Sequence, residues 1–396
     1  MPAIEGASST GSRGPGPARQ LAVQVLAGLA ACESLRVEWN RLVESNAGGI
    51  RGLDATVTYD WCRALSRSHL EDGERQPVIV LRDHDEVVGV MPCFVRSTSR
   101  RGIKIREIAP LTQLYSVRAG FVVQRNNPDY VRHVIQALQT HVPAWDVFMF
   151  NVVEAGDSER ALQQACAALS VTARRIHVHC SPYIELPPSV EEHLARLDKS
   201  FSGDVKRRAR KLRSEGAVQM RVFRTAREVE ELTEIMMSIE KQSWKEDQGT
   251  SITTQATQQR FYQEMTGAAA QAGWLRAFVL YFDGTPIAYT YGMLFGGVFQ
   301  NHKTSYVHAL RSKGPGNVLR LAELEDLCSE GVRLYDFMGA CESYKMRWGS
   351  QRYAVATYAL YNATWRGRLE QLRARLASRR NESATGGATT EDEGGA

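Results

Sequence analysis

The sequence contains no apolar run close to the roughly 20 residues that a membrane-spanning helix needs. Its start, MPAIEGASSTGSRGPGPARQ, lacks the apolar stretch of a secretory signal. The 7 cysteines are dispersed, and no two of them have the CxxC spacing of a zinc site or a thioredoxin-like motif. These absences predict a cytoplasmic protein with reduced thiols and no metal site.

The charge excess is also small, with a formal net charge of +5 and a pI near 8.8. No RNP, helix-turn-helix or finger motif accompanies this charge, so we expect no nucleic-acid partner. The histidines do not have metal-ligand spacing, because His177 and His179 fall on one strand face, where a structural role is the more common one.

A length of 396 residues favours two domains. Residues 1–19 and 381–396 are rich in small and polar residues, and we expect both tails to be disordered. A Pro-Pro pair followed by a predicted capping box, Ser189 with Glu192, indicates the domain boundary. The predicted domains are therefore 20–190 and 191–363, followed by a basic helix at 364–380.

Both halves are predicted to run strand, helix, hairpin, helix and buried strand, which indicates an α/β fold. Residues 77–95 form one predicted hairpin around an Asp-His-Asp-Glu turn. Residues 274–295 form another, which turns on Asp283-Gly284.

The segment RSKGPGNVLR, residues 311–320, places two glycines and two cations before a predicted helix. The N-terminus of a helix presents unpaired N–H groups and a positive dipole, and glycine lets backbone approach an anion closely. We therefore predict a phosphate cradle formed by Arg311, Lys313, Gly314, Gly316 and the amide of Asn317. The alternative is a Pro-Gly turn before an ordinary helix.

This order of elements and the Arg-x-x-Gly-x-Gly loop resemble the GNAT acyltransferase fold. The segments KRRARKLRSEG (206–216), SIEKQSW (238–244), FDGTPIAY (282–289), GPGNVL (314–319) and YDFMGACESYKMRWG (335–349) resemble its two-domain CelD/BcsL-like and FemAB-like branch, the "acetyltransferase 6" group. The resemblance implies two GNAT-like domains in tandem, with mixed sheets flanked by helices and a degenerate first copy. It also implies acyl-CoA as a cosubstrate, an amine acceptor and no permanently bound cofactor.

Candidate catalytic residues lie on either side of the predicted cradle. His302 is on a strand whose alternation places it on one face with Gln300 and Thr304, and so polar a strand suggests a cavity wall. Its usual pKa suits a general base, although a solvated edge strand is the alternative. Asp336, on an apolar strand, is predicted to orient His302 or Lys345, to act as the base, or to form a salt bridge with Lys345 or Arg347.

Tyr344 follows the same strand, where GNAT enzymes often place a tyrosine that protonates the departing thiolate. A packed, hydrogen-bonded tyrosine is the alternative. No cysteine has a sequence context that marks it as a nucleophile.

Two basic segments suggest partners. KRRARKLR (206–213) is either a solvated helix face or a contact for an acidic ligand or an anionic membrane surface. In residues 364–380, Trp365, Leu369, Leu372 and Leu376 form an apolar stripe among arginines, which is typical of a helix lying on an anionic membrane. The alternative is that these side chains pack on the protein's own core.

Three hypotheses follow. The first is an acyl-CoA-dependent N-acyltransferase that acts on a lipid long-chain base at the inner face of the membrane, as in ceramide-type sphingolipid synthesis, or on a cell-surface polysaccharide precursor of cellulose type. The second is a FemX-like enzyme that takes an aminoacyl-tRNA donor, against which the glycine loop argues. The third is a non-catalytic ligand-binding scaffold. Acyl length, acceptor identity and oligomeric state do not follow from the sequence.

Overall fold

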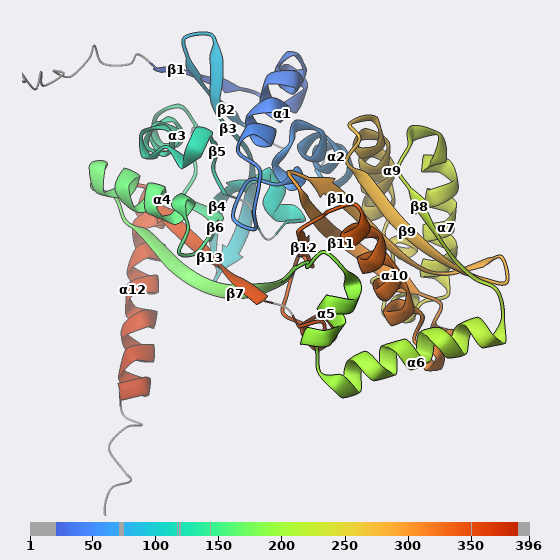
Figure 1. The fold of residues 1–396 in the computed structure, drawn as a ribbon. Helices are drawn as coiled ribbons and strands as arrows, with labels where there is room; N and C mark the ends of the chain where they lie inside the picture. Colours follow the sequence, from blue (N-terminus) through green and yellow to red (C-terminus); the bar gives the residue numbers. More distant parts are fainter. Residues whose placement is uncertain are drawn as a thin grey trace, which may run out of the picture.

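The computed structural model describes residues 21–70, 75–116, 118, 120–142, 144–349 and 351–386. A single mixed sheet of 13 strands runs through the molecule, with helices packed on it (Figure 1). Its strand order is β1-β2-β3-β4-β6-β13-β7-β12-β11-β10-β9-β8, with β5 paired to β3. The predicted α/β class with mixed sheets and flanking helices is confirmed.

The first half supplies seven strands and four α-helices. The strands are β1 (Leu21–Leu26), β2 (Val78–Asp83), β3 (Glu86–Arg100), β4 (Ile103–Pro110), β5 (Val122–Val123), β6 (Val147–Val153) and β7 (Ala173–Glu185). The helices are α1 (Arg36–Ser45), α2 (Tyr59–His69), α3 (Pro128–His141) and α4 (Asp157–Ala168).

The second half supplies the other strands and helices. The strands are β8 (Val218–Phe223), β9 (Leu275–Phe282), β10 (Thr285–Phe295), β11 (Val298–Tyr306), β12 (Leu334–Asp336) and β13 (Gln351–Tyr361). The helices are α5 (Val190–Arg196), α6 (Lys199–Glu215), α7 (Val229–Lys241), α8 (Trp244–Asp247), α9 (Ala256–Gln271), α10 (Pro315–Ser329), α11 (Ser343–Met346) and α12 (Trp365–Gly386).

Both predicted hairpins are present. β2 and β3 pair around His84, which has a φ of 56°. β9 and β10 pair around Asp283 and Gly284, with φ values of 49° and 76°, which is the two-residue geometry that matches strand twist. Ser189 accepts a hydrogen bond from the amide of Glu192 at 3.3 Å and thereby caps α5 as predicted.

The two halves are joined through both the sheet and the core. β13, at the end of the second half, lies between β6 and β7 of the first half. Trp61 of α2 packs edge-on against Phe261 of α9, with ring centroids 4.9 Å apart, inside a core cluster that contains residues from both halves. The two halves on either side of the predicted domain boundary near residue 190 therefore share a sheet and a hydrophobic core.

Both predicted tails fall largely outside the described residues. The first lies outside them entirely, but α12 continues to Gly386, so residues 381–386 are helical rather than disordered. In the part of the chain that the structure describes, no helix is long and apolar enough to cross a membrane.

Candidate active site

A cavity of about 860 Å³ opens where β11 and β12 separate, and we call it the β11–β12 cavity. The two strands pair in parallel only as far as Gln300 of β11 and Asp336 of β12. β12 ends there, while β11 continues to Tyr306 with that edge open. All residues of β11 from 301 to 306 line the cavity, so the prediction that this polar strand borders a cavity is confirmed.

The structure brings together most of the residues predicted from the sequence. The cavity lining includes His302, Arg311, Gly314, Gly316, Asn317, Tyr344 and Lys345. Asp336 and Lys313 are not part of this lining. The lining also contains Tyr115 and Ser116 from the first half, so both halves contribute to the cavity.

A β-bulge at His302 changes which side chains share a face of β11. Tyr291 pairs with Lys303, whereas the next residue of β10, Gly292, pairs with Asn301. His302 is therefore the extra residue, and the strict alternation predicted for this strand is wrong. The bulge therefore changes the direction of the side chains of β11 at the cavity wall.

His302 is neutral at pH 7. Its ring lies half-buried against Trp61 of α2, with ring centroids 4.8 Å apart. Burial, with the Arg118 guanidinium as a second cause, lowers the pKa of His302 to about 3. Among the described residues, its Nε2 has no hydrogen-bond partner. A base with so low a pKa accepts a proton from an amine poorly, so the predicted role of His302 as base has a chemical difficulty.

Two lysines beside His302 face the same cavity. Lys303 Nζ lies 3.8 Å and Lys245 Nζ 3.5 Å from the carboxylate of Glu240, which is completely buried. Burial lowers the pKa of Lys303 to about 8, although Glu240 opposes this shift. Burial also lowers the pKa of Lys245. Of His302 and Lys303, the lysine therefore has the pKa closer to neutrality.

The glycine loop forms the mouth of the cavity. A 3-10 turn, His308–Lys313, ends at Gly314, whose φ of 67° is left-handed and favours glycine. A Cβ on Gly314 would also lie 2.8 Å from Cδ of Arg208. At Gly316 a Cβ would meet only Tyr306, at an ordinary 3.5 Å, so the fold itself does not require glycine there.

The cations of the loop are arranged differently from the prediction. Lys313 is ion-paired with Glu215 and lies over the Phe282 ring, at 5.3 Å from its centroid. Its place at the mouth is taken by Arg208 of α6, which lines the cavity and donates to Ser312 O at 2.7 Å. The assignment of Lys313 to the cradle is therefore corrected to Arg208, because Glu215 holds the lysine elsewhere.

The loop amides also divide into bonded and available groups. The Gly314 amide donates to Arg311 O, and the Asn317 amide donates to Gly314 O at 3.0 Å. Residue 315 is proline and has no N–H. In the described chain the Gly316 amide has no backbone acceptor, so it is the N–H best placed to bind an anion at this helix start.

A rigid cationic group lies below the loop. Arg320 is 4% exposed and donates to Glu323 at 2.8 Å. The amide of Asn301, with its oxygen toward the guanidinium, accepts from Arg320 at 3.0 Å. Glu323 also accepts from Tyr335 and Thr290, and burial raises its pKa to about 7. This hydrogen-bonded group fixes a positive charge at the cavity wall.

The partners of Asp336 differ from those predicted for it. Its carboxylate is fully buried and ion-paired with Arg118 from the first half, and it accepts from Tyr353 at 3.0 Å. Among the described residues, no hydrogen bond or ion pair joins it to His302, Lys345 or Arg347, so those predicted partners are wrong. The sequence distance of 218 residues to Arg118 hides this pair from local reading.

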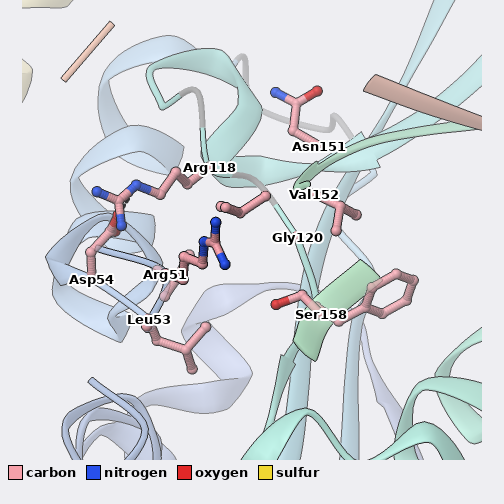
Figure 2. Close-up of a pocket in the computed structure, with 12 residues that line it drawn as sticks. Arg51, Leu53, Asp54, Arg118, Gly120, Asn151, Val152 and Ser158 are labelled. Carbon is pink, nitrogen blue, oxygen red and sulfur yellow. Dashed lines mark ion pairs between the residues drawn. The ribbon is translucent and has the colours of Figure 1, made fainter. Parts of the chain in front are cut away.

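Arg118 also approaches Asp54, at 3.4 Å. Figure 2 shows this guanidinium beside Asp54 at a small cavity of about 40 Å³, which is bordered by Gly120, Asn151 and Ser158. Because Arg118 pairs with Asp54 of the first half and with Asp336 of β12, it forms a junction between the two halves.

The segment after β12 completes the cavity. Tyr344 is 47% exposed, and its pKa is raised to about 12 by desolvation and by Glu342, so it keeps its proton at pH 7. Lys345 Nζ donates to Met338 O at 2.9 Å and lies 2.9 Å from Glu342, and it thus supports the fold of this segment.

A disulfide joins Cys341 of this segment to Cys180 of β7, with Cα atoms 5.8 Å apart. The prediction that all cysteines are reduced thiols is therefore wrong for these two. No spacing pattern indicates this pair, because 161 residues separate the two cysteines.

Several cavity residues were not predicted from the sequence. Arg208 lies within the KRRARKLR run, which had been assigned only as a whole, and Lys303 adjoins His302 in FQNHKTSY. The available signals were the run of cations for Arg208 and the polar strand for Lys303. Tyr115 carried no comparable signal, because tertiary packing alone brings the first half to the cavity.

Among the described residues, no group of three or more His, Cys, Asp or Glu side chains could hold a metal ion. Comparison with known proteins is consistent with the geometry described so far. Residues 199–346 match the family model described as "Acetyltransferase (GNAT) domain", of the Acetyltransf_6 family. A comparison with curated proteins found no significant match.

Solved structures with similar folds extend over both halves. The crystal structure of FemX has a TM-score of 0.57 at 12% identity, over 86% of this chain and 98% of that chain. A conserved protein of unknown function from Bacteroides thetaiotaomicron has a TM-score of 0.54 at 10% identity, over 82% and 97%. A tandem GNAT protein from the clavulanic acid biosynthesis pathway has a TM-score of 0.45 at 14% identity, over 86% and 98%.

Residues 199–346 therefore match a GNAT acetyltransferase domain, and the protein is a transferase. Its fold is that of two GNAT-like halves in tandem, joined by the shared sheet. A GNAT domain implies an acyl-CoA donor and an amine acceptor.

Proposed function

We propose that the protein transfers an acyl group from a CoA thioester to the primary amine of a lipid long-chain base, at the cytoplasmic face of the membrane. The product would be an N-acyl lipid of ceramide type. One observation carries the donor assignment: the β11–β12 cavity opens beside a glycine loop whose mouth holds Arg208 and Arg311. CoA carries phosphates that suit these cations and the Gly316 amide.

The acceptor assignment rests on a different part of the chain. The stripe residues Trp365, Leu372 and Leu376 of α12 are 64%, 53% and 50% exposed. Side chains packed on the protein's own core would be covered. An apolar helix face among arginines suits an interface from which a lipid amine is drawn.

The reaction assigns roles to two side chains of the cavity. The acceptor nitrogen attacks the thioester carbonyl, so that a C–N bond forms and the C–S bond breaks. We propose that Lys303 in its neutral form accepts the proton that the amine loses, because its pKa of about 8 suits a base near neutrality. Tyr344, which is protonated at pH 7, then supplies a proton to the departing thiolate.

His302 would pack against Trp61 and shape the wall rather than take the proton. Asp336 and Lys345 would hold the cavity walls through Arg118 and Met338. These roles differ from those expected from the sequence, and a pH–rate comparison of His302 and Lys303 variants separates them.

The test of the function is CoA release with a panel of acyl-CoAs, each combined with a long-chain base, an amino sugar or water alone. We expect release that depends on both a long-chain donor and the lipid amine. A preference for the amino sugar would favour acylation of a polysaccharide precursor. Gly267→Val, at a position on α9 with nothing within 4 Å of an added Cβ, is the folding control for a cavity variant such as Gly316→Val.

A second candidate donor is an aminoacyl-tRNA, as FemX-like enzymes take. Similarity of fold to FemX along 98% of that chain favours including it. Transfer of a labelled amino acid from aminoacyl-tRNA, with no CoA release from any thioester, would replace the acyl-CoA proposal.

A further inference from the structure

Another cavity, of about 390 Å³, lies beside α12, away from the β11–β12 cavity. Three segments distant in sequence bring arginines to it, and we call it the arginine pocket. Its arginines are Arg100 and Arg101 at the β3–β4 turn, Arg174 and Arg175 at the start of β7, and Arg373 of α12. Glu370 is the only acidic residue in its described lining.

Among the described residues, three of these arginines pair with carboxylates. Glu370 is 7% exposed and is shared by Arg100 and Arg373, at 3.3 and 2.7 Å. Arg100 is also 2.6 Å from Glu107. Arg175 is 2.9 Å from Glu154. Among the described carboxylates, none lies within ion-pair distance of Arg101, which is exposed. Since each guanidinium has five N–H donors, the paired arginines also retain donors for a ligand.

The exposed face of α12 adjoins this pocket. Trp365 and Leu372 are seven residues apart, as are Leu369 and Leu376, so the four side chains form one stripe along the helix. Arginines flank the stripe on both sides, with Arg366 and Arg373 in one row and Arg368 and Arg375 in the other. Figure 1 shows α12 extending away from the rest of the chain.

The helix is attached to the pocket by its other side. Glu370, Arg373, Ala374 and Ala377 of α12 line the pocket, whereas the stripe residues do not. The pocket also includes Ile176, which is 49% exposed. The pocket thus combines cationic donors with one exposed apolar side chain, and the stripe lies on a different face of the same helix.

We propose that the arginine pocket binds the phosphate of an anionic phospholipid headgroup while the stripe of α12 enters the lipid interface. The proposal rests on the membrane association proposed above and gives it a specific headgroup site. Guanidinium groups match phosphate in shape and charge, and the adjoining Trp and Leu side chains match the acyl boundary. A nucleic-acid ligand would match the arginines but would leave the three exposed apolar side chains in water.

The experiment measures co-sedimentation of the full chain with phosphatidylcholine vesicles, with and without phosphatidylglycerol. The pocket variant is Arg101→Gln with Arg174→Gln, and the matched control is Arg41→Gln with Arg227→Gln, two exposed arginines on α1 and before α7. We expect the wild type to prefer phosphatidylglycerol. The pocket variant should bind those vesicles roughly 30-fold more weakly, at about 1 kcal/mol for each arginine, and the control should bind like the wild type.

A third protein, Leu372→Gln with Leu376→Gln, separates the headgroup site from membrane association. If it loses vesicle binding while the pocket variant binds like the wild type, the headgroup site is overturned and the membrane association stands. If the wild type binds no vesicle, the headgroup site and the membrane association are both overturned, whatever result the CoA-release assay gives. Loss of binding to a single-stranded RNA, but not to vesicles, in the pocket variant would reassign the pocket to nucleic acid.

Discussion

The guanidinium of Arg118 and the carboxylate of Asp336 form an ion pair in which the two side chains are 7% and 0% exposed. Arg118 belongs to the first half of the chain and Asp336 to β12, at the point where the β11–β12 cavity begins. Tyr353 of β13 donates to the same carboxylate. One buried charge pair therefore connects the first half, the GNAT domain and the strand that crosses between them.

Removal of this arginine should strongly destabilise the protein. Arg118→Met leaves Asp336 buried with no cation, and breaking a buried pair in this way typically costs about 3–5 kcal/mol. The measurement is the midpoint of urea unfolding. Arg160→Met, which removes an exposed arginine from an i,i+3 pair on α4, should change stability by less than about 1 kcal/mol. Equal effects of the two substitutions would show that the buried pair is not a structural junction.

The glycine loop should be sensitive at Gly316 without loss of fold. An added Cβ there meets Tyr306 at an ordinary distance, so Gly316→Val should fold, but its side chain would enter the space next to the one available loop amide. We expect the Kd for CoA to rise 10-fold or more, on the order of 1.4 kcal/mol. Isothermal titration of CoA measures it. Unchanged affinity in a folded variant would remove the phosphate cradle from the proposal.

Some features of the fold and the site depend on only a few adjacent residues, and these features could be predicted from the sequence. The Asp283-Gly284 hairpin and the Gly314 helix start could be predicted because the residues themselves select the backbone conformation. The cavity wall at β11 could be predicted because polar residues on both faces do not suit a buried strand.

The rest depends on contacts between distant segments, which leave no periodic signal. The bulge at His302 is decided by pairing with β10, and the choice of Arg208 over Lys313 is decided by where Glu215 lies. Insertion of β13 between strands of the first half likewise has no local cause.

The pH dependence of kcat should identify the base. Because the pKa of Lys303 is lowered to about 8, kcat should rise with pH through this value as the amine loses its proton. Lys303→Arg keeps a cation next to Glu240 but cannot act as a base, so kcat should fall by roughly 10²–10⁴ and the rise near pH 8 should disappear. His302→Asn should retain the rise. A profile that is flattened by His302→Asn and unaffected by Lys303→Arg would return the role to the histidine.

The lowered pKa of His302 should also appear in acid stability. The folded state holds this pKa at about 3, against about 6.5 for histidine in an unfolded chain. Below pH 6.5 the unfolded state therefore binds a proton that the folded state does not, and stability falls as the pH falls toward 3. The slope is about 1.36 kcal/mol per pH unit for one proton, so the contribution between pH 7 and pH 5 reaches up to about 2 kcal/mol.

We expect His302→Asn to lose less stability than the wild type over this interval, measured by urea unfolding at both pH values. His141→Asn, at an exposed position on α3, is the matched control. If His302→Asn and the wild type lose the same stability, the histidine is not held neutral by the cavity wall, and its assignment as the base regains support.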